Sequence, residues 1–168
     1  MTERLTLVDE NDQPIAVGDR KEAWAKGYYT RNVRIMLRDQ NGRILLQKRS
    51  TKKASYPGMW TTAASGHVDE DEDWEVAARR ETKEEIGVSV SNLKLIGSFN
   101  FVNDEGKKKI RQIIRVYEGV IDASTEFVLE EDEVEAMKWY GLDELKSLMQ
   151  ETPNDFSPSC RETIKKFY

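Results

Sequence analysis

Short apolar runs separated by turn-forming residues open the chain. Residues 5–8 and 15–17 are apolar and flank the segment DENDQP, whose Asn, Asp and Pro favour a turn, so we predict a hairpin there. A short helix is expected near residues 21–26. Residues 31–49 then form two β-type stretches around Asn41-Gly42, a dipeptide that accepts the positive φ angles of a tight hairpin turn.

The middle of the chain changes from strand to helix. Pro57-Gly58 interrupts regular structure before one short strand that leads to Gly66. Hydrophobic and small residues then recur at every fourth position from 74 to 86, which predicts a helix over residues 73–86. Asp71 or Asp73 is suited to cap its start, and a glycine at position 87 suits a left-handed C-terminal cap.

Alternating strands and helices complete the pattern. Residues 93–102 and 111–121 are predicted strands around the turn-forming segment NDEGKK at 103–108. An acidic loop runs into a strand within residues 127–141, and two helices over 142–150 and 157–168 end the chain, separated by ETPNDF. Strand pairs around one central helix indicate an α+β fold, a mixed sheet with helices packed on it, in a single domain over 1–168.

Charge and cysteine content narrow the class of protein. The chain has 26 Lys and Arg against 31 Asp and Glu, a net charge of −5, which argues against a protein that coats nucleic acid. Cys160 is its single cysteine, so no internal disulfide can form and a reducing cytosol suits the chain. The first fourteen residues show neither a signal peptide nor a membrane span. We expect a cytoplasmic protein.

The predicted central helix carries an unusual concentration of carboxylates. Glu81, Glu84 and Glu85 fall within about a third of the helix circumference, because successive residues are rotated by about 100°. Such a cluster can be a solvated acidic face, in which the like charges repel weakly. It can equally hold a divalent cation such as Mg²⁺, which prefers carboxylate oxygen ligands.

The spacing of residues in the acidic helix and in the segment before it distinguishes a solvated face from a cation site. Seven residues at fixed intervals resemble the Nudix box, and chance agreement at all seven is improbable for a chain of this composition. These positions are Gly66, Glu72, Arg80, Glu81, Glu84, Glu85 and Gly87. One variable position departs from the pattern, because Thr82 stands where the motif prefers an aliphatic residue. We therefore expect looser packing of Thr82 against the sheet.

The resemblance to the Nudix hydrolases implies a fold and a reaction. The fold is an α/β/α sandwich, a mixed β-sheet between helices with a loop–helix–loop metal site. The reaction is hydrolysis of a diphosphate linkage in a nucleoside diphosphate derivative, with Mg²⁺ or Mn²⁺ as cofactor. The implied metal ligands are Glu81, Glu84 and Glu85, together with the carbonyl of Gly66. The resemblance gives Arg80 a structural role, in which it ties the helix to the preceding loop through Glu72.

The resemblance leaves the general base open. The family uses either a glutamate of the box or one from a later loop. Glu81 is the candidate within the box, and the segment LEEDEVE offers Glu131 and Glu133, of which Glu133 is favoured because a similar Glu-Val step precedes the strand in many relatives. A solvated turn that protects a sheet edge is the alternative reading of that loop.

Similarity to isopentenyl-diphosphate isomerases, a branch of the same family, extends over most of the chain. The isomerases use a Cys-Gly-His segment and two further histidines, whereas this chain has Ser65-Gly66-His67. Trp24 and Thr30 stand at the positions aligned with the other histidines. One histidine cannot form a three-histidine site, and serine is a poor substitute for a catalytic thiol. Hydrolysis is therefore favoured.

The isomerase resemblance also points to a phosphate site. Arg49 and Lys53 align with its diphosphate-binding residues, although a solvated basic turn would have the same composition. His67 either contacts phosphate or metal or is a loop residue satisfied by backbone hydrogen bonds, which we favour.

Three functional hypotheses remain. They are a hydrolase of a small-molecule diphosphate, an isomerase and a nucleotide-sensing domain without catalysis. Neither nucleic acid nor membrane is an expected partner. Homodimers are common among relatives, but no feature of this sequence determines the oligomeric state.

Overall fold

The computed structural model describes residues 4–106 and 108–168. Within these ranges nine strands belong to one sheet. The strands are β1 (Leu5–Val8), β2 (Pro14–Gly18), β3 (Tyr29–Arg38), β4 (Ile44–Arg49), β5 (Trp60–Thr62), β6 (Ala64–His67), β7 (Lys94–Glu105), β8 (Lys108–Val120) and β9 (Val134–Tyr140). The helices are α1 (Arg20–Lys26), α2 (Trp74–Ile86), α3 (Leu142–Glu151) and α4 (Pro158–Phe167), with a 3₁₀ turn at Pro153–Asp155.

Strand β3 is the centre of the sheet. It pairs in parallel with β8, and antiparallel with β1, β4 and β6 along different parts of its length. Strand β9 continues the sheet beside β4, and β7 forms a long hairpin with β8. The one parallel pairing among antiparallel ones makes the sheet mixed, as predicted.

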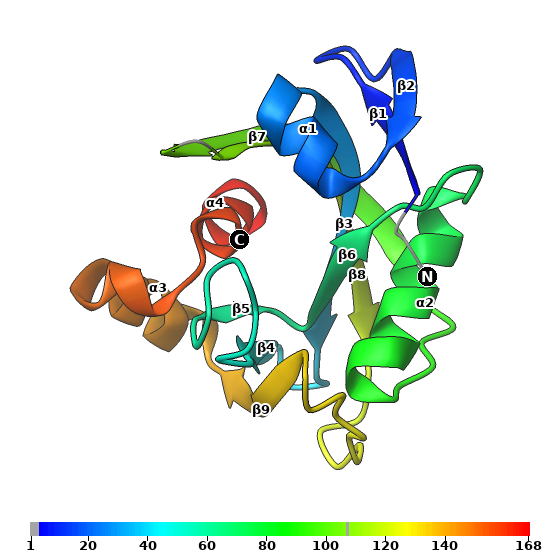
Figure 1. Cartoon of the computed structure of the whole chain (residues 1–168). Coiled ribbons are helices and arrows are strands. Elements are labelled where there is room, and N and C mark those ends of the chain that lie inside the picture. Colours follow the sequence, from blue (N-terminus) through cyan, green and yellow to red (C-terminus); the bar gives the residue numbers. More distant parts are fainter. Residues whose placement is uncertain (1–3, 107) are drawn as a thin grey trace.

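Helices cover both faces of this sheet (Figure 1). Val33, Ile35 and Leu37 point from β3 into the core beneath α2, whereas Met36 points into a second core beneath α3 and α4. The alternation follows from the two-residue period of a strand, which sends successive side chains to opposite faces. The predicted α/β/α sandwich is confirmed, with α2 alone on one face and the C-terminal helices on the other.

The central helix begins and ends near the predicted residues. Asp73 is the N-cap, and its carboxylate accepts a hydrogen bond from the Glu75 backbone at 2.9 Å. Gly87 takes the left-handed conformation at the C-cap, with φ of 74°. Thr82 is fully buried, and its hydroxyl donates to the Ala78 carbonyl at 2.7 Å. The polar group is therefore satisfied inside the helix and does not keep α2 away from the sheet.

Two local expectations need correction. The segment before Gly66 is two strands rather than one, because the chain leaves β4 after β5 and joins β3 as β6. In the β3–β4 turn, Gly42 has a positive φ of 78°, but Asn41 does not. The Asp39 carboxylate instead accepts hydrogen bonds from the backbone N–H groups at 41 and 43, which holds a wider turn.

Some predictions fall on positions that the structure does not cover. Residues 1–3, which belong to the segment assessed for a signal peptide, and Lys107 of the predicted turn at 103–108 lie outside the described residues. Strands β7 and β8 reach farther into that turn than predicted, to Glu105 and Lys108. None of the described helices has the length and apolarity needed to cross a membrane.

Replacement of Gly87 by alanine tests the junction between α2 and the acidic loop. An alanine Cβ at this position would lie 2.7 Å from the Val128 Cβ and 3.0 Å from its carbonyl oxygen, at a φ of 74°. We expect Gly87→Ala to lower the free energy of unfolding by about 1–3 kcal/mol in urea denaturation. Gly58→Ala is the matched control, because Gly58 shares the positive φ but its Cβ would meet nothing closer than 3.9 Å. Equal losses in both variants would contradict the steric explanation.

Candidate active site

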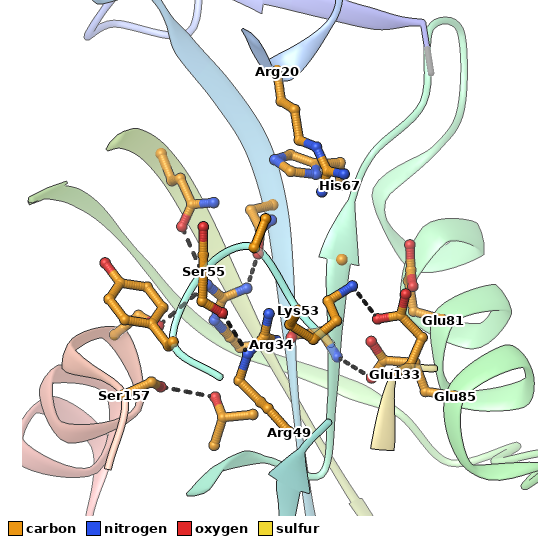
Figure 2. A pocket seen from close by; sticks show the side chains of 18 of the residues that line it. Arg20, Arg34, Arg49, Lys53, Ser55, His67, Glu81, Glu85, Glu133 and Ser157 are labelled. Carbon is orange, nitrogen blue, oxygen red and sulfur yellow. Dashed lines mark hydrogen bonds and ion pairs between the residues drawn. The ribbon is translucent and has the colours of Figure 1, made fainter. Parts of the chain in front are cut away.

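A cavity of about 980 Å³ lies between α2, the loop after β4, the acidic loop before β9 and the start of α4. Figure 2 shows its two halves: carboxylates from α2 and the acidic loop lie on one side, and Arg34 and Arg49 lie on the other. The cavity therefore presents anionic and cationic groups to the same space. Its lining includes the predicted residues Gly66, Glu81, Glu84, Glu85, Glu133, Arg49 and Lys53.

Helix α2 supplies the carboxylates because their spacing places them on one side of the helix. Glu85 is 5% exposed, and the side chain of Glu81 is 14% exposed. Glu84 lies at the edge, with 59% of its side chain exposed. The structure thus brings the three predicted ligands to one cavity, with Glu85 buried, Glu81 partly buried and Glu84 exposed to solvent.

Arg80 connects this helix to the loop before it. Its Nε and Nη2 each donate at 2.8 Å to the Glu72 carboxylate, and Nη2 also donates to the His67 carbonyl at 3.0 Å. Its Nη1 donates to Glu81 at 2.8 Å and to Glu84 at 3.2 Å. One planar guanidinium therefore holds two carboxylates of α2 and the loop that leads into it.

The Arg80 network changes the protonation equilibria of its members. Hydrogen bonds to Glu72 raise the pKa of Arg80 above its ordinary value, so the guanidinium is permanently charged. Burial acts to raise the pKa of Glu72, but the hydrogen bonds from Arg80 and from the Asp69 backbone hold it below the ordinary value. The Glu72–Arg80 pair is therefore ionised at neutral pH.

The negative charges of Glu81 and Glu85 are not fully compensated by the groups around them. Burial, followed by the negative charge of Glu85, raises the pKa of Glu81 to about 8. Burial raises the pKa of Glu85 to about 7, against the opposing hydrogen bonds from Gln47 at 2.6 Å and from the Ser65 backbone at 3.0 Å. A cation in the cavity would stabilise both carboxylates in their charged form.

The lack of a side chain at Gly66 lets Glu81 approach strand β6. A Cβ on Gly66 would lie 2.0 Å from the Glu81 carboxyl carbon and one of its oxygens. Only hydrogen fits between the strand and this carboxylate. The Glu81 carboxylate consequently packs directly against the backbone of Gly66.

The donor set suits a hard divalent cation, although the side chains are engaged with protein groups. Among the residues that the structure describes, no three carboxylate, imidazole or thiol side chains converge as a preformed metal site. Arg80 holds Glu81 and Glu84, while Gln47 and the Ser65 backbone hold Glu85. Carboxylate and carbonyl oxygens are the ligands of Mg²⁺ and Mn²⁺, so the residues fit such an ion chemically.

The acidic loop reaches the cavity by attaching to the end of α2. The backbone N–H groups of Val128 and Glu130 donate to the carbonyls of residues 86 and 85, at 3.1 and 3.0 Å. This attachment places Glu133 at the cavity, where its carboxylate accepts a hydrogen bond from Lys53. Glu131 is exposed and does not line the cavity. Of the two loop candidates for the general base, only Glu133 is placed to reach a ligand.

The predicted cationic residues lie on the opposite wall. Arg49 ends β4, is largely buried, and donates through Nε to the Ser55 carbonyl at 3.1 Å. Burial is the main cause that lowers its pKa, while the charges of Glu85 and Glu133 act in the opposite direction. Lys53 extends from the adjacent loop and bridges to Glu133. Both side chains line the cavity, as a phosphate-binding role requires.

Arg34 is a cavity residue that the sequence reading missed. It is 7% exposed and projects from β3 toward α4, where Gln112 and Ser159 contact its guanidinium. The sequence contained a signal for this residue. Asn32 and Arg34 are polar, and they share one face of the inner strand β3 with the buried Met36. Buried polar residues need hydrogen-bond partners, so two of them on one strand face interrupt an apolar core.

His67 occupies a strand rather than the expected loop. It is the last residue of β6, and its side chain lines the cavity, as does that of Arg20 of α1 (Figure 2). Its carbonyl accepts from Arg80, so its backbone belongs to the network that positions α2.

A family model comparison identifies the scaffold. The model for the NUDIX domain matches residues 28–160, which include the whole of α2 and all of the cavity lining except Arg20 and Trp24. The chain belongs to the Nudix family. Nudix hydrolases among its relatives place it with the pyrophosphohydrolases. An uncharacterised Nudix hydrolase of Pseudomonas aeruginosa is 34% identical over 77% of this chain and 74% of its own length.

Other relatives carry different names. An isopentenyl-diphosphate Δ-isomerase of Photorhabdus laumondii is 33% identical over 98% of this chain and 92% of its own length. A prenyl-diphosphate phosphatase of Methanosarcina mazei is 29% identical over 98% and 94%. The crystal structure of DR0079 from Deinococcus radiodurans superposes with a TM-score of 0.83 over 99% of each chain at 23% identity, which supports the fold.

Arg80→Lys tests whether the guanidinium geometry holds the Nudix helix. Lysine keeps the charge but cannot donate in parallel to both Glu72 oxygens while also reaching the His67 carbonyl and Glu81. We expect a loss of about 1–3 kcal/mol in the free energy of unfolding, because charge-assisted hydrogen bonds at a partly buried site are lost. Lys83→Gln on the same helix is the control, since the Lys83 amine donates to the Gly87 carbonyl at an exposed position. Stability equal to the parent in Arg80→Lys would contradict this role.

Proposed function

We propose that this Nudix protein hydrolyses the diphosphate linkage of a nucleoside diphosphate derivative by attack of water at phosphorus. The proposed cofactor is Mg²⁺ or Mn²⁺, with Glu81, Glu84, Glu85 and the Gly66 carbonyl as its ligands. The observation that carries the proposal is the shared cavity, in which buried carboxylates of α2 face Arg49 and Lys53. A carboxylate wall suits the cation, and a guanidinium–ammonium wall suits the phosphates.

The chemistry divides between the cofactor and the side chains. A bound divalent cation supplies charge neutralisation at the phosphate oxygens and lowers the pKa of water. Arg49 and Lys53 then orient the diphosphate against the carboxylate wall. Glu81 and Glu133 both face the cavity, and either carboxylate can accept the proton of the attacking water.

The structure offers little to the isomerase alternative. Its only thiol, Cys160, is 0% exposed on α4, and burial raises its pKa to about 12. Ser65 stands at the position of the isomerase cysteine, and its backbone N–H donates a hydrogen bond to Glu85. Trp24 lines the cavity and Thr30 is buried, so neither provides a metal-binding imidazole. A thiol that lies outside the cavity and stays protonated cannot move protons at a substrate carbon.

Isoprenoid diphosphates are a second candidate substrate class. The names of two full-length relatives, a prenyl-diphosphate phosphatase and an isopentenyl-diphosphate isomerase, favour testing them. The pairing of phosphate-binding and cation-binding walls serves either class, since both contain a diphosphate. A single domain, a cytoplasmic location and a homodimer stay predictions.

A substrate panel tests the proposed reaction. Nucleoside diphosphates, sugar nucleotides, dinucleotides and isoprenyl diphosphates would be incubated with purified protein and Mg²⁺ or Mn²⁺, and phosphate and nucleotide products quantified. We expect multiple turnovers with at least one compound, and no turnover with a chelator. Binding without release of phosphate would instead support the nucleotide-sensing alternative. Interconversion of isopentenyl and dimethylallyl diphosphate would support the isomerase.

Neutral replacements of the carboxylates test the proposed ligands. Glu81→Gln, Glu84→Gln and Glu85→Gln each remove one negative charge with little change in volume. We expect turnover in the panel assay to fall about 100-fold or more for Glu85→Gln, with an unchanged circular dichroism spectrum. Glu75→Gln is the control on the same helix, because Glu75 pairs with Arg79 away from the cavity. Full activity in all three cavity variants would defeat the ligand assignment.

Gly66→Ala tests the close approach of β6 and Glu81. The added Cβ would overlap the Glu81 carboxylate, which must rotate away because the strand backbone is fixed on both sides. We expect Mn²⁺ affinity, measured by titration calorimetry, to fall at least about tenfold while the melting temperature changes little. Unaltered Mn²⁺ affinity would show that the Glu81 position is not needed for cation binding.

A further inference from the structure

The cationic half of the cavity contains a buried charge that lacks an ionic partner. Arg34 has no carboxylate within ion-pair distance in the described part of the chain, and its Nε has no hydrogen-bond partner. Burial and the neighbouring Arg49 lower its pKa to about 10, so it stays charged at neutral pH. A buried guanidinium beside a second one is unfavourable unless an anion joins them.

Arg34 instead binds neutral oxygens. Its Nη1 donates to the Asn32 side-chain oxygen and to the Val33 carbonyl at 3.2 Å. Its Nη2 donates to Gln112 Oε1 at 3.1 Å and to Ser159 Oγ at 3.3 Å. A guanidinium contains donors only, so the oxygens of both amides must point toward it.

This arrangement leaves hydrogen-bond donors for the cavity. With their oxygens on Arg34, the NH₂ groups of Asn32 and Gln112 point away from it, and neither donates to another described residue. Neither amide nitrogen is a buried atom that lacks a hydrogen-bond partner, and both residues line the cavity. The Ser159 hydroxyl accepts from Arg34, so its own hydrogen is also available. Arg34 is thus a positioning residue. It orients the amides of Asn32 and Gln112 and the hydroxyl of Ser159 so that their hydrogen-bond donors point into the cavity.

The N-terminus of α4 adds to the same surface. Ser157 caps this ten-residue helix, and Ser159 lies in its first turn, so the positive end of the helix dipole faces the cavity. The ligand that fits a surface of donors and positive charge is an acceptor-only anion with several oxygens. A phosphoryl group has that chemistry.

We propose that Asn32, Gln112, Ser159 and Arg49, organised by Arg34, form a subsite for the terminal phosphoryl group of the substrate. The inference rests on the proposed diphosphate hydrolysis for the identity of the substrate. The subsite lies against β3, β8 and the start of α4, on the side of the cavity opposite the carboxylates.

A binding experiment without metal isolates this subsite from catalysis. Inorganic pyrophosphate would be titrated calorimetrically into the full chain in excess chelator, where the carboxylate wall repels it. Asn32→Asp is the key variant: the new carboxylate can pair with Arg34 and preserve the fold, but it replaces the donor by a negative charge. We expect at least about tenfold weaker binding with an unchanged or higher melting temperature. Gln112→Glu should behave in the same way.

The control has the same change of charge outside the cavity. Gln150→Glu on α3 adds one negative charge at an exposed position and should bind pyrophosphate as the parent does. Pyrophosphate binding that is absent in the parent, or equal in Asn32→Asp and the parent, would overturn the subsite. Equal weakening in Gln150→Glu would attribute the effect to net charge and would also overturn it.

Kinetics distinguish this proposal from the proposed function. With a nucleoside diphosphate, Asn32→Asp should raise KM at least about tenfold with a smaller change in kcat, whereas a dinucleoside diphosphate should be little affected. Pyrophosphate binding that responds to Asn32→Asp without any hydrolysis would reject the hydrolase and retain the subsite. Hydrolysis with an unchanged KM in Asn32→Asp would reject the subsite and retain the hydrolase.

Discussion

The fixed position of α2 depends on the contacts of one guanidinium. Arg80 bonds both oxygens of Glu72 and the carbonyl of His67, and its remaining nitrogen reaches Glu81 and Glu84. These contacts join the helix, the loop before it and strand β6. Without the positive charge of Arg80, the adjacent carboxylates of Glu81 and Glu84 would lose their ion pairs on α2. The same ion network that stabilises the helix therefore also aims its carboxylates into the cavity.

Charge separation inside the cavity is the second constraint. The carboxylates belong to α2, and the cations belong to β3, β4 and the loop that follows β4. Because the sheet is rigid, most of these opposite charges cannot approach closely enough to form direct ion pairs. The pairs Lys52–Asp132 and Lys53–Glu133 are exceptions, since all four residues belong to loops and meet across the cavity. Burial raises the pKa of Glu81 and lowers that of Arg34, because it disfavours the charged form of each group. A cation at the carboxylates and an anion at the guanidinium groups would each favour the charged forms.

The anionic wall could be predicted from the sequence, and so could Arg49 and Lys53 of the cationic wall through their resemblance to isomerase residues, whereas Arg34 could not. Helical periodicity places residues 81, 84 and 85 together without knowledge of the fold, and Gly87 marks the end of the same helix. Arg34 meets Gln112 and Ser159, which are 78 and 125 positions away, through pairing of β3 with β8 and packing of α4. No local pattern contains that information. The strand switch between β5 and β6 was missed for the same reason, because tertiary pairing decides where one strand ends.

The comparison with isomerases shows how the scaffold separates binding from chemistry. Retention of Arg49 and Lys53 preserves cations suited to a diphosphate, whereas Ser65 replaces the thiol needed for proton transfer at carbon. Cys160 cannot compensate, since it is buried in the core beneath α4. What the chain keeps is a helix of carboxylates beside the cavity, and such groups suit hydrolysis at phosphorus rather than proton transfer at carbon. Similarity to isomerases over nearly the whole chain is compatible with hydrolysis, because a few side chains of a cavity decide the reaction.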